Sequence, residues 1–173
     1  MDTLIEFAKL LVPAGLVLYA MYLVVKSFLE KDFEKKVIDL RTKNQETVLP
    51  IRLQAYERMT LFLERITPSN LIPRIKTGTL NAKEFQQVLL NEIRAEFNHN
   101  AAQQVYMSQE AWDMIKNAKE DLIVTINNSA AQLPDEASES DLSRKIFETT
   151  METEMDAIGN ALRFIKDEIQ QYF

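Results

Sequence analysis

Residues 10–25, LLVPAGLVLYAMYLVV, form a run of sixteen side chains without a charge. A bilayer core is about 30 Å thick and takes roughly 20 helical residues to cross. The run alone is shorter, but apolar residues continue beyond Lys9 and Lys26. A lysine near a helix end can extend its ammonium group to the headgroups. We therefore predict a transmembrane anchor within residues 1–29, with an effective span of residues 4–29.

Two other interpretations of this segment are a cleaved signal peptide and a buried core helix. The part before the run carries Asp2 and Glu6 against one basic side chain, Lys9, and no small-x-small cleavage site precedes the polar SFLEKDF that follows. The uncharged run is only modestly longer than a core helix allows. Its length and its flanks together favour the anchor.

Basic side chains lie mainly on the C-terminal side of the run. Only Lys9 precedes it, whereas Lys26, Lys31, Lys35, Lys36, Arg41 and Lys43 follow it. Basic residues near the ends of a span mark its cytoplasmic side. We therefore expect the short N-terminus outside and the remainder of the chain in the cytoplasm.

The amino-acid composition restricts the possible fold classes. The chain contains no cysteine and only three glycines. A disulfide framework, a thiolate nucleophile and a thiolate metal site are excluded, which agrees with a reducing compartment. The sequence also has no glycine-rich phosphate loop and no turn clusters at hairpin spacing. These features predict an all-α protein.

The net charge of −6 belongs mainly to the C-terminal segment. Residues 134–173 carry four basic and ten acidic side chains, whereas residues 44–133 carry nine and ten. Binding to nucleic acid phosphates needs a basic face. We therefore expect no nucleic acid among the partners.

Residues 30–48 are predicted to form a charged helical stalk that continues the anchor. Phe28, Phe33, Val37 and Leu40 make a thin apolar stripe at helical spacing, and EKDFEKK allows Glu–Lys contacts three or four residues apart. A solvated stalk and a coiled-coil seam are both compatible with this stripe. Fewer than three clean heptads are present, so the choice stays open.

Residues 49–173 are predicted to form a bundle of about four amphipathic helices. Pro50 is expected to start the first helix, which buries one face up to Ile66, and Pro68 to open a short turn that ends at Pro73. Further helices are expected to begin at a capping box at Asn81, at Ser108 and near Asp141, the last one running to the end of the chain. The apolar stripe expected on the last helix is Leu142, Phe147, Met151, Met155, Ile158, Leu162, Ile165, Ile169 and Tyr172.

Few residues suggest catalysis. Glu96-x-x-His99 has the spacing of one carboxylate–imidazole pair of a di-iron bundle, but such sites need two pairs and this chain has one histidine. Nucleophilic catalysis needs a base and an orienting group, and no motif surrounds any serine. We therefore expect no cofactor, no metal, no small-molecule substrate and no catalysis.

The most distinctive soluble segment is LPIRLQAYERMTLFLERITPSNLIPRIK, residues 49–76. It contains five basic residues, Arg52, Arg58, Arg65, Arg74 and Lys76, against Glu57 and Glu64. Solvated arginines on a bundle helix are one interpretation. The other is a basic surface that contacts anionic headgroups or a protein partner, because arginine pairs with phosphate and with carboxylate.

The order of anchor, charged stalk, LPIRLQAYERMTLFLERITPSNLIPRI and acidic helical tail resembles an uncharacterised family of short single-span proteins from Bacteroidota. The resemblance covers nearly the whole chain. It implies the topology and a bacterial inner membrane, and it adds no catalytic residue. We expect an accessory, scaffold or adaptor subunit of a membrane complex that acts through helix-mediated contacts. The alternatives are a self-associating regulator that contacts anionic lipid through its basic helix, and an enzyme.

Overall fold

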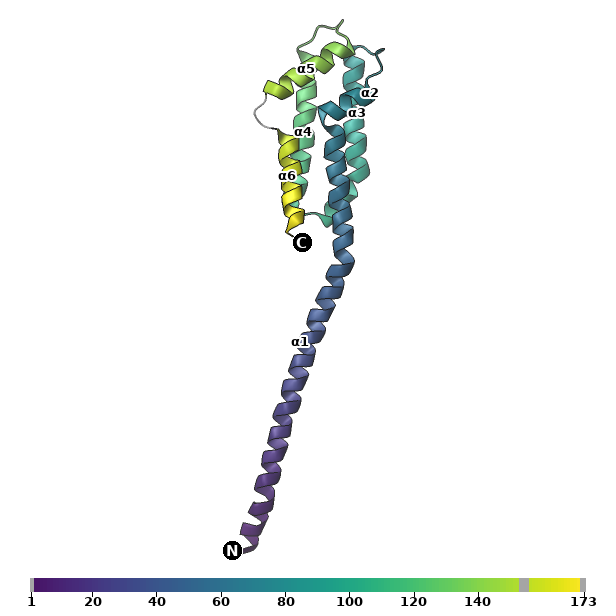
Figure 1. Cartoon of the computed structure of the whole chain (residues 1–173). Helices are drawn as coiled ribbons and strands as arrows, with labels where there is room; N and C mark the ends of the chain where they lie inside the picture. The colour runs from purple at the N-terminus through teal and green to yellow at the C-terminus, as the bar shows by residue number, and fades with distance from the viewer. Residues whose placement is uncertain (1, 153–155, 172–173) are drawn as a thin grey trace. The chain divides into compact units, whose positions relative to one another are not determined.

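The computed structural model describes residues 2–152 and 156–171, and every regular element in these ranges is a helix (Figure 1). The prediction of an all-α protein is confirmed. The chain divides into two compact units, Met1–Leu49 and Pro50–Phe173. Each unit is considered by itself below.

Helix α1, Asp2–Ile66, includes the predicted anchor, the stalk and the first bundle helix. The expected start of a new helix at Pro50 is therefore wrong. A proline inside a helix removes one hydrogen bond, here the one to the carbonyl oxygen of Glu46. Glu46 and Pro50 are both exposed, so water can satisfy that carbonyl group and the helix continues.

The first unit exposes its apolar side chains. Among the described residues, exposed fractions in the run range from 46% at Leu23 to 69% at Val24. Leu11–Asp39 is a helical stretch long and apolar enough to cross a membrane, and none of its apolar window is buried inside the protein. The charged side chains of that stretch lie at its C-terminal end, from Glu30 onward, apart from Lys26.

The second unit is a bundle formed by the end of α1 and the helices that follow. These are α2 (Pro68–Ile75), α3 (Ala82–Asn100), the 3-10 helix η1 (Ala101–Tyr106), α4 (Gln109–Ala131), α5 (Glu139–Glu152) and α6 (Ala157–Gln170). Helix α4 packs against α3, α5 and α6, and α3 also packs against α5 (Figure 1). Helix α4 is therefore the central element of the bundle.

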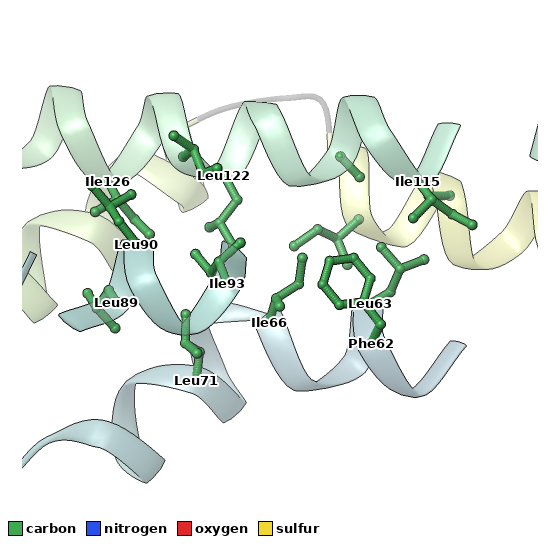
Figure 2. Close-up of a cluster of buried hydrophobic side chains, with 14 of the residues drawn as sticks. Phe62, Leu63, Ile66, Leu71, Leu89, Leu90, Ile93, Ile115, Leu122 and Ile126 are labelled. Atoms are coloured by element: carbon green, nitrogen blue, oxygen red, sulfur yellow. The ribbon is translucent and has the colours of Figure 1, made fainter. Parts of the chain in front are cut away.

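One apolar core joins these helices. The stripe expected on the end of α1 is confirmed, because Ala55, Tyr56, Met59, Phe62, Leu63 and Ile66 are all buried. Figure 2 shows Phe62, Leu63 and Ile66 pointing toward side chains of α3 and α4 such as Ile93 and Leu122. Burying an aliphatic or aromatic side chain contributes about 1.5–3 kcal/mol, so this stripe is a main source of the bundle's stability.

Two of the expected helix starts are confirmed in atomic detail. The Asn81 side chain accepts a hydrogen bond from the backbone N–H of Glu84 at 2.8 Å, and Glu84 accepts from the N–H of Asn81 at 3.1 Å. The Ser108 hydroxyl accepts from the N–H of Ala111 at 3.1 Å. Pro68 opens α2 as expected, but the expected end at Pro73 is wrong, because α2 contains Pro73 and continues to Ile75. The Thr67 hydroxyl before it donates to the Leu63 carbonyl at 3.0 Å and does not cap α2.

The loop before α3 is fastened to the start of α5. The Ala82 N–H donates to the Ala137 carbonyl at 2.9 Å, and the Glu139 N–H donates to the Leu80 carbonyl at 3.3 Å. Gly78, at φ 84°, donates its N–H to the buried carboxylate of Glu139. These contacts hold the two connections together at one end of the bundle.

The expectation of a single last helix is wrong, because α5 and α6 are separate. Helix α5 buries Leu142 and Ile146, and α6 buries Ile158 and Ile165. In one continuous helix, Ile158 would point about 120° away from Ile146 at 100° per residue, and the break lets each helix bury its own stripe. Phe147 and Met151 of the expected stripe are exposed, and Met155 and Tyr172 lie outside the described residues.

Candidate functional site: the basic segment

The five predicted basic residues lie on the bundle part of α1 and on or just after α2. Arg58, Arg65, Arg74 and Lys76 are exposed, and Arg52 is half-buried. Glu57 and Glu64 are exposed beside them on α1. These side chains lie in three different environments.

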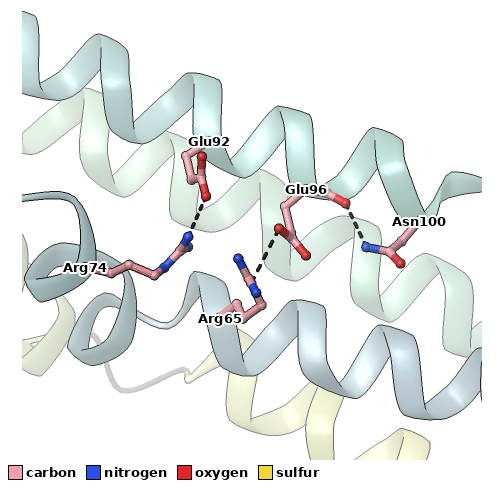
Figure 3. Close-up of polar contacts among 5 residues, drawn as sticks. All are labelled: Arg65, Arg74, Glu92, Glu96 and Asn100. Carbon is pink, nitrogen blue, oxygen red and sulfur yellow. Dashed lines mark hydrogen bonds and ion pairs between the residues drawn. The ribbon is translucent and has the colours of Figure 1, made fainter.

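Arg65 and Arg74 face α3 (Figure 3). Arg74 Nη1 lies 2.5 Å from Glu92 Oε1, and Arg65 Nε lies 3.4 Å from Glu96 Oε2. Glu92 and Glu96 are one turn apart on α3, so the two ion pairs follow one another along that helix. Exposed pairs of this kind contribute about 0.2–1 kcal/mol each, because water and salt screen them.

Arg52 lies in a second environment with Tyr56. Arg52 Nε donates to the Tyr106 carbonyl at 3.1 Å, and the Ser108 N–H donates to the Tyr56 hydroxyl at 3.4 Å. Burial raises the pKa of Tyr56 above its ordinary value, and the nearby Glu168 carboxylate raises it further, while the Ser108 hydrogen bond acts in the opposite direction. The phenol therefore stays protonated at neutral pH and joins α1 to the start of α4.

Arg58 and Lys76 form the third environment. Arg58 lies on the outer face of α1, and Lys76 follows the C-terminus of α2. Neither has an ion pair with another side chain in the part of the chain that the structure describes. These two side chains are the ones with charge available to an external anion or carboxylate.

The five residues therefore do not converge on a single site. Sequence reasoning did not foresee that Glu92 and Glu96 neutralise two of the arginines. A partial signal was present, since Glu92 and Glu96 are carboxylates one helical turn apart on an amphipathic helix. That signal does not identify the partner, because packing of α1 and α2 on α3 decides which residues meet.

Glu96 and His99, which have the spacing of a metal-ligand pair, both lie near the C-terminal end of α3. Glu96 is directed to Arg65, and His99 is exposed at the last turn of α3. Within residues 2–152 and 156–171, no group of three or more His, Asp or Glu side chains is arranged to hold a metal ion.

A groove of about 560 Å³ lies elsewhere in the bundle, between the start of α2, α4 and the facing ends of α5 and α6. Leu122, Val124 and Ile158 supply apolar walls, and Asp121 and Asp156 are the carboxylates at its border. None of the five basic residues lines this groove.

The described structure defines an all-α protein with one N-terminal helix apolar enough to span a membrane and a compact helical bundle. The chain belongs to the family of unknown function DUF7935, which matches residues 2–172. No curated protein and no solved structure shows significant similarity to the chain. The match covers nearly the whole chain, and the family has no assigned activity.

Proposed function

We propose that this protein is a single-pass accessory, scaffold or adaptor subunit of a bacterial inner-membrane complex, with its N-terminus outside and its bundle in the cytoplasm. The observation that carries the proposal is the exposed apolar surface of α1 from Leu11 to Leu29. Burying apolar surface stabilises a protein by about 25 cal/mol per Å², so this surface favours a lipid environment. The bundle then supplies a rigid surface for protein contacts without catalysis.

The charge pattern of the basic segment supports protein contact over lipid contact. Arg65 and Arg74 are engaged by carboxylates of α3, which lowers the positive charge that a headgroup layer would meet. Arg58 and Lys76 retain exposed charge, so a membrane-proximal regulator that binds anionic lipid is the second candidate.

Membrane fractionation tests the anchor. The full chain is expected in the membrane pellet after alkaline carbonate washing, because a spanning helix is not released by raised pH or salt. Leu18→Arg with Val17→Arg is expected to weaken this retention, since an arginine at mid-span costs about 2.5–3.5 kcal/mol on insertion scales. The matched control is Glu57→Arg with Glu64→Arg on the bundle, which should stay in the pellet. Release of the parent chain by carbonate would contradict the proposal.

Extraction of the full chain in mild detergent tests the adaptor role. Proteins that co-purify with the parent are expected to be reduced by Arg58→Gln with Lys76→Gln. Retention of the same proteins together with lost binding to anionic liposomes would instead favour the lipid-binding regulator.

A further inference from the structure

The stalk, residues 30–48, carries a heptad pattern that begins near the C-terminal end of the apolar stretch Leu11–Asp39. Phe33, Val37, Leu40, Asn44 and Thr47 follow one another at alternating spacings of four and three residues. These are successive d, a, d, a and d positions of a heptad. The backbone is helical throughout this range, as part of α1. Such spacing produces one seam along the helix, suited to a partner helix.

The residue types in the seam indicate which partner fits. A β-branched residue at a, here Val37, combined with leucine at d, here Leu40, favours two parallel strands. Asn44 occupies the next a position, where an asparagine specifies register and the two-stranded state at some cost in stability. An identical chain in parallel register places the same a position of the second copy opposite Asn44, so the asparagine positions coincide.

The seam face is open to a second helix. Phe33 and Thr47 are exposed, and Val37 is half-buried. Lys36 falls at a flanking g position of the heptad, beside the seam. Asp32 Oδ2 contacts Lys36 Nζ at 2.9 Å, which lowers the net positive charge beside the seam.

Insertion into one membrane favours association through the short seam. About two heptads bury little apolar surface, so association through the seam alone is weak in water. Two copies inserted by the same N-terminal helix are already parallel, and confinement to one bilayer raises their effective concentration. This step rests on the proposed function.

We propose that the chain forms a parallel, in-register homodimer through the stalk seam, defined as Phe33, Val37, Leu40, Asn44 and Thr47. Each residue of the seam then lies opposite the same residue of the second copy. The dimer presents two bundles on one membrane site, which makes the subunit a bivalent scaffold.

Single-cysteine cross-linking tests this arrangement directly, because the parent chain contains no cysteine. Phe33→Cys and Val37→Cys place a thiol in the seam, and Lys35→Cys and Asp39→Cys place one at the outward f and c positions. In membranes of cells producing the full chain, mild oxidation is expected to yield disulfide-linked dimer severalfold more at the seam positions than at the outward ones.

A matched pair of substitutions separates the seam from general helix effects. Val37→Glu in the Phe33→Cys background places like charges in the seam and is expected to abolish the dimer band. Ile38→Glu, one residue away at an outward b position, is expected to leave it. Ile38 is 61% exposed, so the control changes only a solvated position.

Three results would overturn the homodimer: equal cross-linking at all four positions, no dimer from either seam position, or adducts that contain a different protein. Carbonate fractionation of the same samples keeps the two proposals apart. If the protein stays in the pellet but cross-links no better at the seam positions than at the outward ones, only the dimer is rejected. If the protein is released from the pellet, the anchor is rejected, and the cross-linking yields still decide whether the dimer forms.

Discussion

At the scale of single residues, an aromatic cluster ties α1, α3 and α4 together. The Phe62 and Phe97 rings are 5.6 Å apart and tilted, and the Phe97 and Trp112 rings are 5.3 Å apart and stacked. Lys119 Nζ lies 4.4 Å from the Phe97 ring centre, and the same ammonium group contacts Glu120 at 2.6 Å. The cluster therefore combines apolar burial with a cation–π contact at the edge of the core.

Trp112→Ala is expected to lower the free energy of unfolding by about 3–5 kcal/mol, since large aromatic side chains leave a cavity when removed from a core. Trp112 is 8% exposed and is the only tryptophan of the chain, so the variant has no tryptophan fluorescence. Unfolding of the full chain in mild detergent is therefore followed by circular dichroism. The control is Val124→Ala, also on α4 but 53% exposed, expected to change stability by less than about 0.5 kcal/mol. A loss below about 1 kcal/mol for Trp112→Ala, together with weaker partner binding, would make Trp112 an interface anchor instead.

At the scale of elements, α3 is the electrostatic counterpart of α1 and α2. Its two carboxylates, Glu92 and Glu96, lie one turn apart and each meets an arginine from a different helix. The arrangement leaves the bundle with paired charges along this side, while Arg58 on α1 remains exposed. Two arginines of the basic segment therefore pair with carboxylates of the bundle itself.

A double-mutant cycle with Arg74→Gln and Glu92→Gln is expected to give a coupling energy of about 0.2–1 kcal/mol that decreases with salt. Trp112 fluorescence reports bundle unfolding for all variants, because no other tryptophan is present. The control cycle pairs Arg58→Gln with Glu92→Gln and should be additive within about 0.3–0.5 kcal/mol. Equal coupling in the two cycles would show that the ion pair seen at Arg74 does not contribute in solution.

At the scale of the whole molecule, the proposed orientation in the membrane rests on the distribution of basic residues, and it can be tested. One basic residue precedes the uncharged run and six follow it by Lys43. A reporter fused after Phe173 is therefore expected to be active only when that reporter works in the cytoplasm. As a control, Lys31→Gln, Lys35→Gln and Lys36→Gln combined with two lysines added near Thr3 should shift part of the population to the opposite orientation. Activity of an extracytoplasmic reporter on the parent chain would reverse the proposed topology.

The sequence by itself determined the features that depend on neighbours within about one helical turn. The capping groups of Asn81 and Ser108 and the buried stripe ending at Ile66 were predictable, because caps and periodicity are local. The all-α class followed from composition in the same way. The uncharged run needed only length and charge to identify a helix able to span a membrane.

Only the tertiary structure decided which of several local options the chain takes. Pro50 can start a helix or lie within one, and here the exposed Glu46 carbonyl lets α1 continue. The run after Asp141 can form one helix, yet packing of both halves on α4 separates α5 from α6. Arg74 meets Glu92, eighteen residues later, because α2 and α3 pack together. The last two choices depend on contacts between segments far apart in the chain, which local propensity does not encode. The first depends on the exposure of the helix around Pro50 to solvent.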